Sequence, residues 1–294
     1  MTGHVGSSSR RRNRPAWQSR STRYGPFAVA EHRFVIDTDV PELGERATEA
    51  LHDLLAHGPT GDAAVVYEVA RTSPAWTTHP WGVWRDGEPC QTQLADWYVL
   101  PYLVWELTSL LLAGVGDRVA LHAGAAALGD RAVVLAGRSH SGKSTLSGWL
   151  THRGWSFLTD EVAVIDPTSL VVQPFWRPIG VRRGGPLSAI AGPRDAEEWL
   201  VPASHFGRLA GPSRLRAFLL ASYRPGSSTA LRRMSSAEAT VELLQSVPGL
   251  RQAGRSRFLG VAHLVERTAV YALEVDDLDV AEREIRALIE DEHS

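Results

Sequence analysis

The segment GRSHSGKS at residues 137–144 constrains the fold of this chain more than any other feature, because it matches G-x-x-x-x-G-K-[ST] in full. An apolar run typical of a strand, residues 132–136, precedes it, and a run typical of a helix, residues 143–153, begins at its end. The motif is informative because it lies between a predicted strand and a predicted helix. We therefore expect an α/β domain built around this loop.

The chemistry of such a loop suits phosphate groups. Glycines let backbone N–H groups point inward, and the helix N-terminus adds partial positive charge, so di- or triphosphate oxygens are held. Lys143 would neutralise the β- and γ-phosphates, and the Ser144 hydroxyl would ligate Mg²⁺. The residues expected to contact the nucleotide are Gly137, Arg138, Ser139, His140, Ser141, Gly142, Lys143, Ser144 and Thr145.

The use of basic residues supports the same interpretation. The chain has 31 lysines and arginines together, and Lys143 is the only lysine. A genome rich in G and C would replace lysine by arginine wherever either cation serves. Arginine cannot replace a compact ammonium that must fit between phosphates. Lys143 is therefore expected to have a role in the loop that arginine could not fill.

Two carboxylates follow the loop at a short distance. Asp160 and Glu161 lie 17 and 18 residues after Lys143, at the end of an expected strand. Asp160 could take a proton from an acceptor hydroxyl, and Glu161 could hold Mg²⁺ directly or through water. A solvent-facing acidic turn is the alternative. His122, 21 residues before Lys143, is expected to end a strand that pairs with the strand feeding the loop, either as a packed residue or as part of the site.

Bulk composition excludes several classes of protein. The 44% hydrophobic and 22% charged content is ordinary for a globular chain, and a net charge of −2 gives no reason to expect nucleic acid or membrane binding. The most apolar stretch, residues 98–114, contains Pro101 and Glu106, which predicts a buried helix rather than a membrane span. Cys90 is alone, so an internal disulfide is excluded. We expect a cytoplasmic protein.

The 294 residues divide into four expected parts. They are a disordered basic tail (1–24), a small α+β lobe (25–92), a connecting helix (93–116) and the loop-containing domain (117–294). Expected elements of the lobe are strands at 27–37 and 63–71, a helix at 41–57 and a hairpin around an Asp-Gly pair. In the larger domain we expect strands at 118–128, 131–136, 156–165, 215–223 and 270–275, and helices at 143–153, 236–245 and 281–290.

The combined motifs resemble the HPr kinase/phosphorylase family, and in particular HPr-kinase-related kinases that include enzymes of lasso-peptide clusters. The resemblance lies in LHAGA at residues 121–125, in the loop, and in FLTDEVAVID at residues 157–166. It continues through PFWRPIGVR at residues 174–182 and covers about residues 117–290. The loop alone is common to very many proteins, whereas the combination is specific.

This resemblance implies a twisted, mixed sheet flanked by helices, like that of HPr kinase and phosphoenolpyruvate carboxykinase. It implies ATP with Mg²⁺ as donor and a hydroxyl, usually serine, as acceptor. It assigns Asp160 as general base, Ser144 and Glu161 to the metal, and His122 to the neighbourhood of the phosphates. Arg182, helped by Arg177, would stabilise the transferring phosphoryl charge.

Three departures from the family pattern bear on function. Glu161 stands where the family's acidic pair usually has a second aspartate, the segment after Arg182 lacks obvious features of the bifunctional enzymes, and the small lobe does not resemble the HPr-kinase N-terminal domain. The expected acceptor is therefore a hydroxyl of a peptide, protein or small metabolite. A P-loop ATPase or nucleotide-dependent switch acting on a protein partner is the alternative, and homo-oligomer formation stays open.

Overall fold

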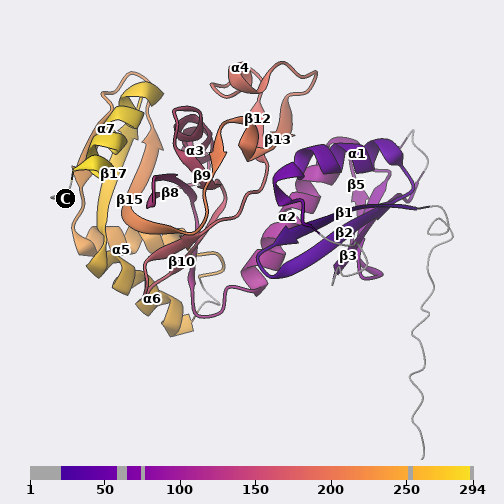
Figure 1. Ribbon diagram of the computed structural model, residues 1–294, viewed down its shortest axis with the longest axis horizontal. Coiled ribbons are helices and arrows are strands. Elements are labelled where there is room, and N and C mark those ends of the chain that lie inside the picture. The colour runs from indigo at the N-terminus through magenta and orange to yellow at the C-terminus, as the bar shows by residue number, and fades with distance from the viewer. Residues whose placement is uncertain (1–20, 58–64, 74–76, 251–253, 292–294) are drawn as a thin grey trace, which may run out of the picture. The chain divides into compact units, whose positions relative to one another are not determined.

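The computed structural model describes residues 21–57, 65–73, 77–250 and 254–291 (Figure 1). These residues form two compact units, one drawn from the described residues between 21 and 49 and between 55 and 105, and the other from those between 50 and 54 and between 106 and 291. Residues 1–20 of the expected disordered tail, 1–24, lie outside the described residues, and the expectation is wrong at its end, because a strand begins at Thr22. Within the described ranges, no helix combines the length and the apolar character that a membrane crossing requires.

The first unit is a five-stranded sheet with strand order β1-β2-β3-β4-β5. Its elements are β1 (Thr22–Val29), β2 (His32–Thr38), α1 (Pro41–Ala50), β3 (Val65–Arg71), β4 (Trp81–Arg85) and β5 (Glu88–Leu94). Strands β2 and β3 are parallel and the other neighbours are antiparallel. The core contains large fully buried side chains, among them Phe27, Phe34, Tyr67 and Trp81.

The hairpin expected around Asp86 and Gly87 is confirmed. Both residues have positive φ, 54° and 82°, which is the backbone that a two-residue turn matching the twist of its strands requires. The strand expected at 27–37 is wrong as one element, because β1 ends at Val29 and β2 starts at His32. Ala30 adopts φ of 50° and reverses the chain there, a turn that no glycine or proline signals.

Helix α2 (Val99–Ala113) begins after a 3₁₀ turn at Asp96–Tyr98, and the division between the units falls within it. The second unit then contains a ten-stranded mixed sheet and a separate pair of strands, β12 and β13. The strands of the large sheet are β6 (Val119–His122), β7 (Gly124–Leu128), β8 (Arg131–Ala136), β9 (Ser156–Thr159), β10 (Val162–Asp166), β11 (Val171–Gln173), β14 (Arg208–Leu209), β15 (Ser213–Tyr223), β16 (Ala230–Arg233) and β17 (Ala269–Val275).

The remaining elements of this unit are α3 (Lys143–His152), β12 (Ile179–Arg182), α4 (Ser188–Ala191), β13 (Glu198–Val201), α5 (Ser236–Gln245), α6 (Gly254–Arg267) and α7 (Leu278–Glu290). The architecture is mixed α/β. Strands β8, β15 and β17 are parallel to one another, and their carboxyl ends share one edge of the sheet.

Helices cover both faces of this sheet (Figure 1). Strand β8 is apolar throughout because it is buried on both sides: Ala132 and Val134 pack toward α5 and α6, and Val133 and Leu135 pack toward α3 and α7. This double burial fixes the direction of β8. The loop at its carboxyl end is thereby held in place by the core of the unit.

Two further strands are shorter than expected. The expected strand at 118–128 breaks at Ala123 into β6, which pairs with β10, and β7, which pairs with β8 and β9. The expected strand at 156–165 breaks at Asp160 and Glu161 into β9 and β10. Both breaks arise because the two halves pair with different partners, which a local hydrophobic pattern does not encode. Helices α4 and α6 and strands β11, β12, β13, β14 and β16 were not expected from the sequence.

Candidate functional site

The loop between β8 and α3 depends on its glycines. Gly137 has φ of 142° and Gly142 has φ of 92°, backbone conformations that side chains disfavour. A Cβ at Gly137 would lie 2.7 Å from the carbonyl oxygen of Ala221 on β15, closer than atoms can approach. The loop therefore packs directly against the end of the neighbouring strand, and only glycine allows that approach.

The N-terminus of α3 opens into the site. Gly142 is its N-cap and provides no side-chain cap, and the first helical hydrogen bond runs from the Leu146 N–H to the Gly142 carbonyl, 2.8 Å. The N–H groups of the preceding first-turn residues, Lys143, Ser144 and Thr145, have no acceptor within the helix. Together with the helix dipole, these donors make the end of α3 attractive to an anion.

Lys143 lies inside the loop rather than in solvent. Its Nζ donates to the carbonyl oxygens of Gly137 and Arg138, both at 2.9 Å, and the residue is only 5% exposed. Burial lowers the pKa of the ammonium, and the negative charges of Glu161 and Asp160 offset only part of this effect. The loop thus holds one buried cation against its own backbone.

The other loop residues lie around the same space. Ser139, His140 and Ser141 line the cleft together with Thr145. His140 has φ of 63°, an uncommon backbone conformation for a residue with a side chain. Within the described part of the chain, the Ser141 hydroxyl is buried and has no hydrogen-bond partner. An unpaired buried hydroxyl is costly, so its presence here is consistent with a site that receives a polar ligand.

Asp160 lies in the bend between β9 and β10 and is 3% exposed. Its carboxyl faces Arg177, whose Nε is 3.5 Å from Oδ1. Burial raises the pKa of Asp160, Glu161 adds to the increase, and Arg177 and a hydrogen bond from Ser144 oppose it without cancelling it. The bend therefore brings a poorly solvated carboxyl to the first turn of α3.

Glu161 is held by two basic side chains. Its Oε1 is 3.0 Å from Nδ1 of His122, and its Oε2 is 2.9 Å from Nη1 of Arg177. Burial raises the pKa of Glu161, but the hydrogen bonds and charges of His122 and Arg177 outweigh burial and hold the pKa below its ordinary value. The two neighbouring carboxyls thus have pKa values shifted in opposite directions.

The structure brings His122 to this group by a route other than the expected one. His122 ends β6, and β6 pairs with β10 rather than with β8, so the expected pairing with the strand that feeds the loop is wrong. In that register His122 lies opposite Val162, immediately after Glu161. Because β6 ends at His122 and β10 begins directly after Glu161, the pairing of these strands places the imidazole beside the carboxylate.

The two arginines expected near the phosphates occupy different positions. Arg177 contacts both carboxyls and its side chain is only 14% exposed. Arg182, on β12, also lines the cleft, but its side chain is 65% exposed and its Nε is 3.6 Å from Oε2 of Glu198. Arg177, rather than Arg182, is therefore the arginine that contacts Asp160 and Glu161.

One cleft of about 870 Å³ within the second unit is lined by most of these groups, namely His122, residues 139–145, Asp160, Glu161, Arg177 and Arg182. Gly137 and Arg138 are not among its lining residues.

Sequence patterns did not single out Trp149 and Asp277, which also line the wall of this cleft, whereas Tyr223 and Asp279 lie in two short segments, residues 223–226 and 278–281, to which the family resemblance extends weakly. Asp277 caps α7 by accepting hydrogen bonds from the N–H groups of Asp279 and Val280, and Asp279 accepts one from the Trp149 indole. An aspartate just before a helical run is a sequence signal for such a cap.

The expected metal ligands were Ser144 and Glu161. Among the described residues, no group of three or more His, Cys, Asp and Glu side chains is arranged to hold a metal ion. Ser144 interacts with Asp160, and Glu161 is paired with His122 and Arg177. Oxygen atoms of the kind that Mg²⁺ prefers are nevertheless present at the first turn of α3, where a nucleotide phosphate could complete the set.

No family model and no curated protein match the chain. Among solved structures, the chain is similar to the HPr(Ser) kinase/phosphatase from Coxiella burnetii, with 14% sequence identity. The match covers 57% of this chain and 94% of that chain, with a TM-score of 0.34. This is a weak structural relationship.

Proposed function

We propose that this chain is an ATP-dependent kinase with an HPr-kinase-like P-loop core, which transfers the γ-phosphoryl group to a hydroxyl of a peptide, protein or small metabolite. The observation that carries the proposal is the position of Asp160. A buried carboxyl with a raised pKa lies in the same cleft as the glycine-rich loop and contacts Ser144. A carboxylate that can take a proton, next to bound phosphates, would activate a hydroxyl acceptor.

The loop would hold the triphosphate through its backbone. The free N–H groups at the start of α3 would donate to phosphate oxygens, and the Lys143 ammonium would exchange its contacts with loop carbonyls for phosphate oxygens. Ser141 offers a further donor that has no partner among the described residues. These donors belong to residues that line the same cleft, so they could contact the same phosphate groups.

The residues present fit a magnesium ion that arrives with the nucleotide. Oδ1 of Asp160 is buried and accepts no hydrogen bond from the described residues, and Ser144 lies beside this carboxyl. Ser144 would hold the ion, with Glu161 contributing directly or through water. The ion, when bound, would neutralise charge on the phosphate oxygens.

In transfer, Asp160 would take the proton of the acceptor hydroxyl as that oxygen forms its bond to the γ-phosphorus and the bond to ADP breaks. A raised pKa makes Asp160 a stronger base than an ordinary aspartate. Arg177 lies between the two carboxyls and would balance their charge, His122 would hold Glu161, and Arg182 would contact the transferred group or the acceptor at the exposed side of the cleft.

The main competing function is a P-loop ATPase or nucleotide-dependent switch that acts on a protein partner. Such a protein would hydrolyse ATP without an acceptor and would respond to its partner. It would not need a buried carboxyl to deprotonate an alcohol. The two functions therefore differ in where the γ-phosphate goes.

The test follows the γ-phosphate of labelled ATP in the presence of a cell extract from the source organism. The kinase proposal predicts that label appears on a hydroxyl of an acceptor with the wild-type chain, and that Asp160→Asn and Lys143→Ala each abolish this labelling. Release of all label as inorganic phosphate, at a rate unaffected by Asp160→Asn, would support the ATPase instead and reject the kinase.

A further inference from the structure

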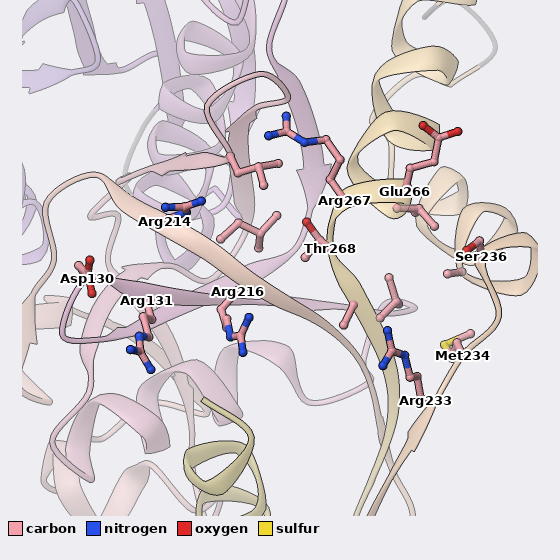
Figure 2. Close-up of a pocket in the computed structure, with 16 residues that line it drawn as sticks. Asp130, Arg131, Arg214, Arg216, Arg233, Met234, Ser236, Glu266, Arg267 and Thr268 are labelled. Atoms are coloured by element: carbon pink, nitrogen blue, oxygen red, sulfur yellow. The ribbon is translucent and has the colours of Figure 1, made fainter. Parts of the chain in front are cut away.

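Acidic side chains gather on one wall of the candidate active site, between β17 and α7. This part of the wall consists of Val275, Asp276, Asp277, Leu278 and Asp279. Another cavity of the second unit, about 890 Å³ at the amino ends of β8, β15 and β17, has the opposite character, with five arginines and two acidic residues in its lining (Figure 2). The acidic wall disfavours phosphate groups, although it belongs to the same cleft as the glycine-rich loop.

Two of the three carboxylates on this wall are not paired with a basic side chain of the described residues. Asp279 pairs with Arg153. Oδ1 of Asp277 caps α7, and Oδ1 of Asp276 accepts a hydrogen bond from the N–H of Gly226. No described residue forms an ion pair with Asp276 or Asp277, or a hydrogen bond with the Oδ2 atom of either. Each therefore keeps an acceptor atom for a donor group of a ligand in the cleft.

An aromatic residue adjoins the two aspartates. Tyr223 ends β15, lies opposite Val275 in the parallel pairing with β17, and is 56% exposed. A Cβ on Gly142 would lie 3.8 Å from the Cβ of Tyr223, so this tyrosine also adjoins the last glycine of the loop. Tyr223 lines the cleft, and an aromatic ring in such a place provides a flat surface on which a nucleobase can stack.

The order of the strands places the glycine-rich loop between this wall and Asp160. β9 pairs with β7, β7 with β8, β8 with β15, and β15 with β17 (Figure 1). At about 4.8 Å between neighbouring strands, the end of β8 lies roughly 10 Å from the end of β9 on one side and from the end of β17 on the other. A ligand whose phosphates lie at the loop can thus extend toward either side.

We propose that Tyr223, Asp276 and Asp277 form the nucleoside subsite of this cleft, an inference that rests on the proposed function. The base stacks on Tyr223, and the ribose hydroxyls donate to the two carboxylates. Carboxylates repel a triphosphate but accept hydrogen bonds from hydroxyls, so this wall selects the uncharged end of the nucleotide. The γ-phosphate is thereby directed toward Asp160, and the ligand class is a ribonucleoside triphosphate.

Calorimetric titration of the full chain with two probes separates this subsite from the loop. The probes, both with Mg²⁺, are a non-hydrolysable ATP analogue and inorganic tripolyphosphate, which has phosphates but no nucleoside. Tyr223→Ala should weaken binding of the analogue on the order of tenfold, as the loss of one stacked base does. It should change the affinity for tripolyphosphate by about twofold or less. Tyr223→Phe keeps the ring and should bind both probes as the wild-type chain does.

Phe258→Ala is the matched control for the tyrosine. Phe258 lies on α6, is similarly exposed at 47%, and is not among the residues that line the cleft. This variant should keep the wild-type affinity for both probes. Because both replaced rings are exposed, the unfolding temperatures of Tyr223→Ala and Phe258→Ala should stay near that of the wild-type chain.

The aspartates are tested by Asp276→Asn combined with Asp277→Asn, since asparagine oxygens can still accept the backbone N–H groups that these aspartates hold. The wild-type chain should bind the ATP analogue on the order of tenfold more tightly than its 2′,3′-dideoxy counterpart, which lacks the hydroxyl donors. The double variant should lose most of this preference. Its affinity for tripolyphosphate should stay the same or rise, because two negative charges are removed.

Three results would overturn the nucleoside subsite. They are an unchanged affinity of Tyr223→Ala for the analogue, an equal loss of affinity for both probes in that variant, and equal binding of the ribose and dideoxy forms by the wild-type chain. Failure of the proposed function gives a different pattern, in which the wild-type chain binds neither probe or Lys143→Ala weakens neither. The proposal predicts that Lys143→Ala weakens both probes, whereas Tyr223→Ala weakens only the analogue.

Discussion

The two ends of β8 present positive charge in different ways. At the carboxyl end, backbone N–H groups and one buried lysine form a site within a continuous stretch of sequence. At the amino end, arginines from distant segments surround a cavity, and their donors are mostly exposed side chains. The groups at the first end are preorganised by the fold, whereas the exposed side chains at the second end would lose more conformational entropy if they bound a ligand.

The largest expected effect is that of Asp160→Asn, at the carboxyl end of β8, on phosphoryl transfer. Removing a general base should lower the rate of phosphoryl transfer by about 10²–10⁴-fold. Affinity for ATP should change much less, because the loop donors remain. Comparing kcat with the equilibrium affinity checks this, and retained turnover would remove Asp160 from the chemistry.

Lys143→Ala should weaken both nucleotide binding and transfer, because a buried ammonium that contacts two loop carbonyls is lost. Charged hydrogen bonds of this kind correspond to a loss of about 10- to 100-fold in affinity. Equilibrium binding of an ATP analogue measures the effect. The exposed Arg182→Gln is the matched comparison within the same cleft, and it should affect nucleotide affinity less than Lys143→Ala does.

Gly137→Ala should damage the loop through sterics. The new Cβ would lie 2.7 Å from the Ala221 carbonyl, so the loop and the end of β15 must separate. Gly154 is the control, since it also has positive φ, 94°, but a Cβ there meets no atom within 4 Å. Strained backbone costs each variant about 1–2 kcal/mol. Only Gly137→Ala should also lose nucleotide affinity, and equal affinities of the two variants would contradict the close packing.

The pH dependence of stability should reveal the cost of Asp160. Its pKa is raised in the folded chain, so its stabilising contribution is complete below the unfolded value and is lost as the pH rises through the folded value. Asn does not ionise. The Tm of Asp160→Asn should therefore rise relative to wild type as the pH increases above 3.8, by about 2–4 °C per kcal/mol. A Tm difference that stays constant or decreases with pH would contradict the burial of this carboxyl.

The smallest expected effect is that of Thr268→Val on the stability of the chain. Thr268→Val should be neutral or should stabilise the chain by about 1 kcal/mol, because it removes a buried hydroxyl that lacks a partner among the described residues. Thr151→Val is the comparison. The Thr151 hydroxyl donates to the Ser147 carbonyl at 2.8 Å, so its removal should destabilise the chain. Urea unfolding of both variants decides, and a destabilised Thr268→Val would mean that its hydroxyl is satisfied.

The same contrast explains how far the sequence alone could predict the molecule. Strand β8, the loop and α3 follow from local patterns, and the structure confirms these elements at Arg131–Ala136 and Lys143–His152. The strand breaks beside His122 and Asp160 were missed, because they depend on which distant strand each half pairs with. Those breaks are what bring His122 to Glu161.

The arginine cavity could not be predicted for a similar reason. Its walls come from residues as distant in sequence as Arg131 and Arg267, and no spacing rule relates them. Arg177 is an intermediate case. The family resemblance placed it near the phosphates as a helper of Arg182, whereas its contact with both carboxyls became visible only in the folded chain.

The most direct test of the central claim is a crystal structure of the chain with Mg²⁺ and a non-hydrolysable ATP analogue. The account predicts that the β- and γ-phosphates lie within hydrogen-bond distance of Lys143 and the N–H groups that open α3, with the γ-phosphate on the side of Asp160. A nucleotide bound at the arginine-lined cavity instead, with the glycine-rich loop in contact only with its own lysine, would contradict it.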